Sequence, residues 1–431
     1  MYKKISVPVI LCMLSIQLRA TDKLFIPEDC IYENNIKTVL LYPKMGSARD
    51  IAQSPVLPIQ QSYPLILAFD ELYENYKSYY IKIIHCNKDW SVSFLMSMEY
   101  MNEINESLIT TYSISTSTKV PYVHYQVEIP KVKLTGNYIV KVYRNRDEDD
   151  IIISRRFMVY DNKVQINPQI TFSNVASEMK KNQQINFTIS YSGVDIINPQ
   201  QNVQVVIRQN QRWDNAIYNL PPLFVKENDK LLEYTYFNLE NNFKGGNEFR
   251  SFDTRTATFA GMNVEKINMK PNGPAEAYLF VDKPRDKQPY SWMPDINGKY
   301  VVENYDLDGS ATTGADYIKV YFSLFIPKLS RGNVYVAGGF SDWKINELYQ
   351  LDFDPIRNVY TGAVLVKQGW YNYTYLIEES TRSGIMRSSS AIDGDYVDTE
   401  NQYEVLVYTR PVGSRSDVLI GYISIQYNMR N

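Results

Sequence analysis

Residues that commonly carry catalysis or bind metal ions are scarce in this sequence. His85 and His124 are its two histidines, so the side chain most used for acid–base catalysis and zinc binding is nearly missing. The sequence contains no Gly-x-Ser-x-Gly or His-Glu-x-x-His motif, no phosphate-binding loop and no dinucleotide fingerprint. Paired carboxylates for glycoside hydrolysis need no local motif, which leaves a glycosidase as a weaker alternative. We therefore expect a protein that is not an enzyme, with structural histidines and without cofactor or metal.

Charged and aromatic side chains alternate in Asn241–Arg255, which reads NNFKGGNEFRSFDTR. Gly245 and Gly246 permit a tight turn with positive φ, and the residues after them alternate as in a β-strand. Opposite charges two residues apart can pair along one face, which favours a structural strand, or they can meet a partner. The candidates for partner contact in this segment are Phe249, Arg250, Phe252 and Arg255.

Three tryptophans occupy positions where a ring can contact a ligand or a partner. Trp90 follows a strand and a short polar turn, so it either closes the end of a sandwich core or contacts a partner. Val334–Ile377 contains Gly-x-Phe-x-x-Trp followed by Gly-x-Tyr-x-Tyr, and in this it resembles glycogen-binding and E-set immunoglobulin-like modules. In carbohydrate-binding members exposed aromatic rings stack on sugars. The resemblance implies Trp343 and Trp370 as sugar-stacking candidates, with core or interface packing as the alternative.

An acidic loop lies near the C-terminus, in the sequence DGDYVDTEN, with carboxylates at Asp393, Asp395, Asp398 and Glu400. Calcium binds several oxygen ligands in loops of this kind. Val397, however, occupies a position where an EF-hand needs a ligand, so we expect a solvated turn.

Met1–Ala20 has the pattern of a secretory signal peptide. Lys3 and Lys4 give a positive start, Ile5–Ile16 an apolar run, and Ala20 a small residue at the cleavage point. The apolar run is shorter than the roughly 20 residues that span a bilayer. We expect cleavage near Ala20 and an exported chain without a direct lipid anchor, which is periplasmic in a cell with an outer membrane.

Two cysteines, Cys30 and Cys86, remain after this cleavage. An exported protein can form a disulfide, but sequence does not fix the distance between the two Cα atoms. A Cys30–Cys86 bridge and two separate thiols therefore both stay open. The net charge of −3 gives no long-range attraction to nucleic acid or anionic lipid, so we expect no nucleic-acid partner.

The rest of the chain predicts short strands separated by turn signals, with no helical periodicity. In Leu134–Tyr138 the sequence LTGNY resembles the tyrosine corner of immunoglobulin-like sandwiches. Residues 282–316 are rich in Pro, Gly, Asn and Asp and predict a linker or long loop. We expect an all-β protein of tandem immunoglobulin-like or E-set β-sandwiches: after the signal peptide at 1–20, an N-terminal sandwich at 21–160, a middle sandwich at 161–300 and a C-terminal E-set-like sandwich at 301–431.

Several segments taken together resemble one family, the type IX secretion system plug proteins. These segments are Ile36–Pro43, Leu67–Trp90, Thr135–Asp161, Gln211–Ala216, Gly245–Asp253, Asp398–Arg410 and Asp417–Tyr422. The resemblance implies a periplasmic all-β protein whose partner is the outer-membrane β-barrel translocon, which it closes while no substrate passes. It brings no catalytic motif. The alternative function is a periplasmic carbohydrate-binding protein that uses the C-terminal domain.

Overall fold

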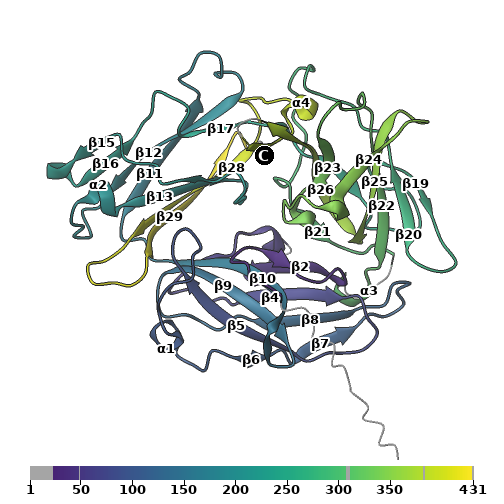
Figure 1. The fold of residues 1–431 in the computed structure, drawn as a ribbon, viewed down its shortest axis with the longest axis horizontal. Helices are drawn as coiled ribbons and strands as arrows, with labels where there is room; N and C mark the ends of the chain where they lie inside the picture. The colour runs from purple at the N-terminus through teal and green to yellow at the C-terminus, as the bar shows by residue number, and fades with distance from the viewer. Residues whose placement is uncertain (1–22, 48, 307–310, 382–383, 430–431) are drawn as a thin grey trace, which may run out of the picture.

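A computed structural model of the chain describes residues 23–47, 49–306, 311–381 and 384–429, so the expected signal peptide at 1–20 lies outside the described residues. The all-β prediction is confirmed (Figure 1). Within the described ranges the α-helices are single turns of four residues: α1 (Ser97–Tyr100), α2 (Pro199–Asn202), α3 (Ala311–Gly314) and α4 (Ser390–Asp393).

The first sandwich packs two sheets around one apolar core. One sheet has the order β2 (Ile36–Pro43), β4 (Leu65–Glu71), β8 (Val123–Glu128) and β7 (Thr111–Ile114). The other has the order β1 (Cys30–Ile31), β10 (Asp147–Tyr160), β9 (Gly136–Arg144), β5 (Tyr79–Cys86) and β6 (Ser107–Leu108), with β3 (Val56–Pro58) parallel to β10. In β5 buried Tyr79, Ile81 and Ile83 alternate with less buried neighbours, the period expected of a strand with one face in the core.

The predicted tyrosine corner closes this first sandwich. The buried Tyr138 hydroxyl donates a hydrogen bond of 2.7 Å to the carbonyl oxygen of Leu134. The same arrangement recurs in the C-terminal half, where the Tyr371 hydroxyl donates to the carbonyl oxygen of Lys367 at 2.6 Å.

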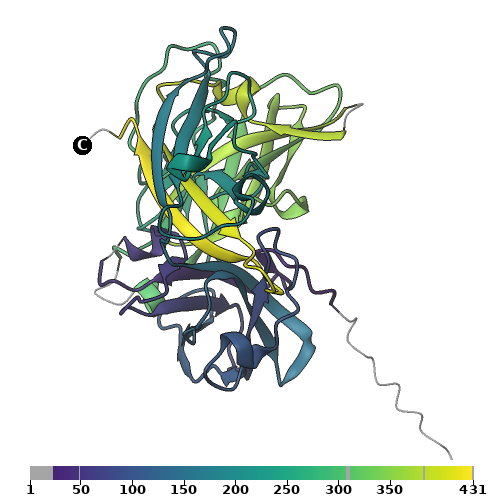
Figure 2. The ribbon, with the colours of Figure 1, turned by 90° about the vertical axis from the view of Figure 1, so that its left-hand side faces the viewer.

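The second sandwich combines strands from two distant parts of the chain. One sheet has the order β11 (Gln165–Phe172), β12 (Asn182–Ser190), β16 (Leu231–Tyr234) and β15 (Phe224–Lys226), with β17 (Asn242–Lys244) also paired to β12. The other has the order β14 (Ile217–Tyr218), β13 (Gln204–Gln209), β28 (Asn401–Thr409) and β29 (Val418–Tyr427). Figures 1 and 2 show these last two strands, in yellow, beside the teal strands of the middle of the chain.

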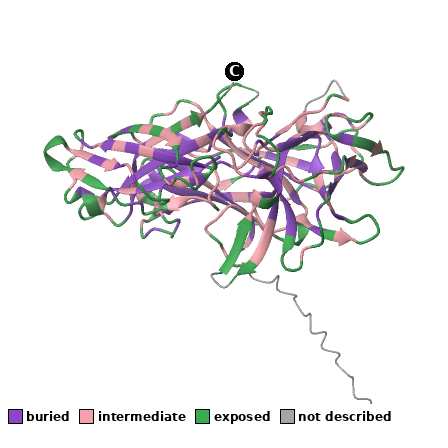
Figure 3. Cartoon of the chain, turned by 90° about the horizontal axis from the view of Figure 1, so that it is seen from above, coloured by how far each residue is buried: buried purple, intermediate pink, exposed green. Residues whose placement is uncertain are grey.

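The third sandwich is formed by one sheet of ten strands, eight of which follow a single path. Its order is β18 (Arg250–Asp253), β26 (Gly369–Thr381), β23 (Asn333–Ala337), β24 (Gln350–Asp354), β25 (Val359–Lys367), β22 (Tyr317–Leu324), β20 (Ala275–Leu279) and β19 (Val264–Asn268), with β21 (Tyr300–Val302) and β27 (Gly384–Ser388) also paired to β26. Buried residues follow the strands inside the sandwiches, while exposed residues lie on the loops and outer ends (Figure 3).

The predicted boundary between residues 300 and 301 is wrong, because the sheets divide the chain differently. Strands β18 to β20 pair within the third sandwich although they precede residue 300, and β28 and β29 pair with β13 of the second. The third sandwich is therefore inserted between two parts of the second. The linker or long loop predicted at 282–316 lies within the third sandwich in its described residues, 282–306 and 311–316, and it contributes β21.

Candidate functional site

The glycine pair predicted as a turn is where the chain crosses from the second sandwich to the third. The carbonyl oxygen of Gly246 accepts hydrogen bonds from the Tyr396 amide at 2.8 Å and from the Thr399 hydroxyl at 2.9 Å. The outgoing and returning segments therefore lie side by side. A Cβ atom on Gly245 would lie 1.9 Å from the Tyr396 carbonyl oxygen, so this position requires glycine, and the φ of +67° at Gly246 favours glycine there.

Arg250 is buried beside this crossing rather than exposed to a partner. Its guanidinium pairs with Asp282 at 2.6 Å and with Asp393 at 2.9 Å. Burial alone would lower the pKa of Arg250, but the carboxylates of Asp393 and Asp282 outweigh it and raise the pKa. We expected Asp393 to lie in a solvated turn. This expectation is wrong, because the Asp393 carboxylate is buried and also pairs with Arg285.

The neighbouring contact candidates are also engaged within the chain. Phe252 is fully buried and stacks on Tyr371, with ring centroids 5.1 Å apart. Phe249 lies 5.7 Å from the Trp343 ring. Arg255 keeps part of its side chain accessible and pairs with Asp253 at 2.6 Å, the pairing within one face that alternation predicts. Arg250 and Phe252 are thus excluded as surface contacts.

Three carboxylates, from Glu248, Asp295 and Glu400, gather at the same crossing. The Glu400 amide donates to the Glu248 carboxylate at 3.2 Å, and the Tyr290 hydroxyl donates to the same group. Burial raises the pKa of Glu248 and raises that of Asp295 to about 7, even though the amide of Asn297 donates to Asp295. No group of three or more His, Cys, Asp or Glu side chains in the described ranges is arranged to hold a metal ion.

Trp90 is buried at the junction of the first and second sandwiches. A turn holds it in place with φ +68°, and its amide donates to the Asn87 carbonyl oxygen at 2.9 Å. The ring lies 5.0 Å from Trp213 of the second sandwich and 4.5 Å from the guanidinium of Arg156. Trp90 therefore joins two domains of its own chain, and this burial excludes it as an exposed partner contact.

A buried ion pair of the second sandwich lies next to Trp213. Arg208 on β13 and Glu404 on β28 are cross-strand partners with an Nε–Oε2 distance of 2.5 Å. The Arg208 guanidinium also lies 4.4 Å from the Trp213 ring and donates to the Ser54 hydroxyl of the first sandwich at 2.8 Å. Trp213 lies in a segment that carries the family resemblance, but nothing in its local sequence indicates this contact.

The two sugar-stacking candidates are partly buried. The guanidinium of Arg212, from the second sandwich, lies 3.9 Å from the centre of the Trp343 ring. That ring also packs against Phe249 and the backbone of Gly298, so the contacts of Trp343 lie between domains. Trp370 is half-buried on β26, opposite Asp253 and Val301.

A buried charge network joins the first and third sandwiches. The Asp70 carboxylate on β4 accepts hydrogen bonds of 2.7 Å from Lys367, His124 and Tyr317. Burial alone would raise the pKa of Asp70, but Lys367 and His124 outweigh burial and lower it. The Tyr317 hydroxyl also bonds the Thr38 hydroxyl at 2.7 Å. Asp70 and Lys367 are 297 positions apart, so no local motif predicts their contact.

The two cysteines and His85 are unreactive where they lie. Cys30 and Cys86 are free thiols on β1 and β5, so the alternative of two separate thiols is confirmed. Burial raises the pKa of Cys86 to about 12, and burial raises that of Cys30, which disfavours thiolates. Burial lowers the pKa of His85 to about 4, so its ring is neutral at pH 7 and structural.

One segment of the first sandwich exposes several large apolar side chains, and its sequence predicts no role for it. We call residues 92–104 of the first sandwich the apolar loop; it contains α1, at the lower left of Figure 1. Its exposed side chains include Phe94 at 82%, Met96 at 63%, Met98 at 74% and Ile104 at 85% of full accessibility. The run VSFLMSMEYM was the available signal, because it is rich in apolar residues, although their near-alternation is also typical of a strand. Large exposed apolar patches are typical of interaction surfaces.

The fold and its junctions define a class of protein, an all-β chain whose three sandwiches are joined through buried polar and aromatic contacts. Residues 36–161 match the family model described as type 9 secretion system plug protein 1st domain. The match confirms, over the first sandwich, the resemblance to the type IX secretion plug family, and it indicates a role in type IX secretion.

The whole architecture occurs in a solved structure. A hypothetical protein from Parabacteroides merdae ATCC 43184, determined by crystallography at 2.30 Å resolution, aligns with a TM-score of 0.86 and 29% sequence identity. The alignment covers 93% of this chain and 99% of that chain, so the two share the arrangement of all three sandwiches. A comparison with curated proteins gives no match. No helix in the described residues is long and apolar enough to cross a membrane.

Proposed function

We propose that this protein is a non-enzymatic periplasmic plug that binds the outer-membrane translocon barrel of the type IX secretion system and closes its pore while idle. The observation that carries the proposal is the family match of the first sandwich. The proposal also assigns a cleaved signal peptide at residues 1–20 and a position at the inner side of the outer membrane.

The junctions support this role physically. A plug for a wide pore must resist deformation, and each pair of sandwiches here is connected through buried or half-buried groups: Asp70 with Lys367, Trp90 with Trp213, and Gly246 with Tyr396. Buried contacts between domains disfavour relative motion more strongly than polar surface contacts do.

The apolar loop is our candidate for contact with the barrel, in place of Arg250 and Phe252. Phe94 and Met98 are its central exposed side chains, and flexible methionines suit a surface that must adapt to a partner. The loop belongs to the domain that carries the family match.

The proposal is tested by affinity capture of the tagged chain from detergent-solubilised outer membranes. The wild-type chain is expected to retain a large barrel protein, and Phe94→Ser with Met98→Ser is expected to reduce its recovery at least about tenfold, as for loss of central interface anchors. Phe237→Ser, which changes an exposed phenylalanine of the second sandwich, is the matched control. Capture of no barrel, or an outer membrane that stays impermeable to large solutes when the gene is deleted and export is idle, would contradict the proposal.

The carbohydrate-binding alternative is tested by affinity electrophoresis in α-glucan gels. Arg212 covers one face of Trp343, so we expect no retardation of the wild-type chain. Retardation that Trp343→Ala or Trp370→Ala abolishes would establish the alternative.

A further inference from the structure

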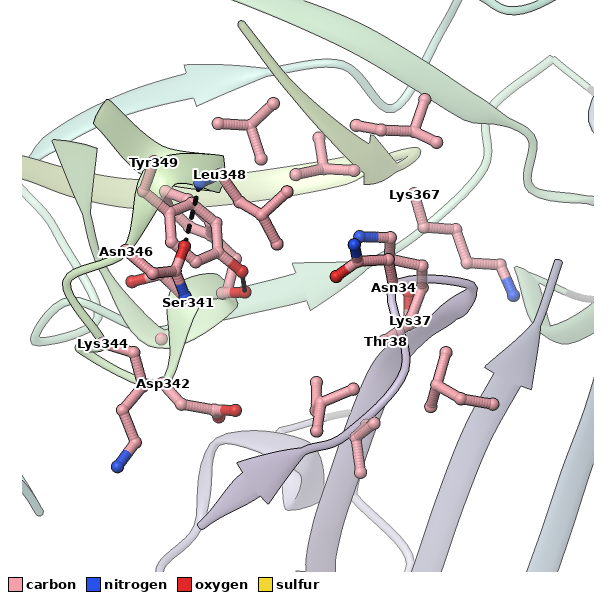
Figure 4. Close-up of a pocket in the computed structure, with 18 of the residues that line it drawn as sticks. Asn34, Lys37, Thr38, Ser341, Asp342, Lys344, Asn346, Leu348, Tyr349 and Lys367 are labelled. Carbon is pink, nitrogen blue, oxygen red and sulfur yellow. Dashed lines mark hydrogen bonds between the residues drawn. The ribbon is translucent and has the colours of Figure 1, made fainter. Parts of the chain in front are cut away.

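A cavity of about 650 Å³ lies between the first and third sandwiches. Figure 4 shows Asn34, Lys37 and Thr38 of the first sandwich on one side and Leu348 and Tyr349 of the third on the other. The volume falls within the range of roughly 300–1,000 Å³ that is usual for small-molecule sites. The cavity is separate from the apolar loop, and its role does not depend on the proposed plug function.

The walls of the cavity are largely apolar. Ile31 and Val39 contribute from the first sandwich, and Phe340, Leu348 and Val364 contribute from the third. Leu348 remains about half exposed, so a ligand can reach this wall from solvent. Such walls favour an apolar ligand body, because each buried methylene gains from leaving water.

The charged groups of the cavity leave positive charge without a partner. Its carboxylates are Asp29, Glu33 and Asp342. Asp342 pairs with Arg155 at 2.8 Å, Glu33 pairs with Lys23 at 2.7 Å, and Asp29 accepts the Arg156 amide at 2.8 Å. Among the cationic side chains, Lys344 pairs with Glu28 and Lys367 with Asp70.

These pairings leave two lysines of the lining, Lys319 and Lys37. The Lys319 ammonium lies 5.3 Å from the centre of the Tyr321 ring, so Lys37 is the lysine considered for the ligand. No carboxylate in the described part of the chain lies within ion-pair distance of its ammonium group. Its cross-strand neighbour on β4 is Asp70, but that carboxylate is already held by Lys367, His124 and Tyr317. Burial lowers the pKa of Lys37, as expected for an ammonium in apolar surroundings without a counter-charge.

An unpaired ammonium beside apolar walls suits a ligand with one negative group and an apolar body. We propose that this cavity binds a medium-chain alkyl carboxylate, whose carboxylate pairs with Lys37 and whose chain lies against Phe340, Leu348 and Val364. The ligand bridges the first and third sandwiches, so binding stabilises their junction by mass action.

The proposal is tested by isothermal titration calorimetry of the full chain with sodium decanoate, sodium dodecanoate and dodecanol. Dodecanoate is expected to bind roughly tenfold more tightly than decanoate, because two further methylenes are buried. Lys37→Met is expected to weaken dodecanoate binding at least about tenfold, the loss typical of a hydrogen bond to a charged group. Lys37→Arg is expected to retain binding, because it keeps the charge.

Two further variants separate the site from general effects on the fold. Ala363→Phe places a ring in the cavity from β25 and is expected to abolish binding even if Lys37→Met fails to fold. Lys133→Met, which removes an exposed lysine outside the cavity, is expected to bind as the wild type does. Absence of dodecanoate binding, equal binding of dodecanol, or undiminished binding by a folded Lys37→Met or Ala363→Phe variant would overturn the proposal.

Discussion

The junction of the first sandwich with the third and its junction with the second are built from different chemistry. The first–third junction centres on the buried carboxylate of Asp70 and the ammonium of Lys367. The first–second junction contains, beside the Arg208–Glu404 pair, an apolar cluster in which Trp90 and Met158 meet Leu406 and Leu419. A buried ion pair must offset the loss of hydration of both charges, whereas an apolar cluster gains from leaving water.

Because of this difference, the two junctions lose stability for different reasons when a side chain is removed. Removing one member of a buried pair leaves the other charged and without hydration, so the penalty exceeds the value of the contact itself. Removing an apolar side chain loses its transfer free energy and leaves a cavity. The contribution of the buried carboxylate of Asp70 therefore depends on pH, and that of the apolar cluster does not.

Asp70→Asn is expected to have the largest effect. The substitution leaves the Lys367 ammonium buried without a carboxylate, and we expect the free energy of unfolding to fall by roughly 3–5 kcal/mol, measured by urea denaturation at pH 7. Combining it with Lys367→Met is expected to recover part of the loss. Glu148→Gln removes a half-exposed carboxylate that pairs with Lys82, and as the control it should cost less than about 1 kcal/mol. An Asp70→Asn variant as stable as this control would contradict the ionic account of the junction.

Leu406→Ala is expected to cost somewhat less, about 3 kcal/mol, through lost burial and a residual cavity. Leu406 is fully buried in the apolar cluster. The same urea experiment at pH 5 and pH 8 is expected to give the same loss, because no charge changes. Val412→Ala, at an exposed position of the β28–β29 loop, should be nearly neutral. A loss that varies with pH would mean that this junction also relies on titrating groups.

The sequence predicted elements better than it predicted their partners. Strand alternation and the tyrosine corner at Tyr138 are local properties, and the structure confirms them. The tight turn predicted at Gly245 and Gly246 is wrong: the chain crosses there to the third sandwich, and of the two glycines Gly246 has a positive φ. The second corner, at Tyr371, has the same Gly-x-Tyr spacing and could have been found by the same criterion.

The local sequence pattern does not predict which distant strands and side chains pair. Alternation makes β28 a strand but does not state that it pairs with β13, about two hundred positions earlier. Arg250 was expected either to pair within its own segment or to contact a partner, yet its partners Asp282 and Asp393 lie 32 and 143 positions away in the same chain. A local charge pattern therefore indicates that a charge is paired, but not by which residue or at what depth.

The crossing between the second and third sandwiches responds to pH in the opposite direction from Asp70. The pKa of Asp295 is raised to about 7 by burial, so the folded state holds a proton that the unfolded chain loses near pH 4. Its contribution to stability is full below about pH 4 and is lost as the pH rises through 7. Asp70 has a lowered pKa, so its contribution is present above about pH 4 and is lost at lower pH.

We expect Asp295→Asn to remove a decline of roughly 2 kcal/mol in the free energy of unfolding between pH 5 and pH 8. Urea denaturation across this range measures the slope for wild type and variant. Asp352→Asn changes a carboxylate on an exposed position of β24 and is expected to leave the slope unchanged. An identical slope in wild type and Asp295→Asn would show that Asp295 does not hold the proton.

The smallest expected effects separate the sandwiches themselves from their junctions. Tyr138→Phe and Tyr371→Phe each remove one hydroxyl that bonds a carbonyl oxygen four positions earlier, and each keeps its ring. We expect each to lower the free energy of unfolding by about 1 kcal/mol, the usual net value of such a bond. The double variant should lose the sum, because the residues lie in different sandwiches and share no partner. A loss well above the sum would show that the first and third sandwiches are coupled through their corners as well as through Asp70 and Lys367.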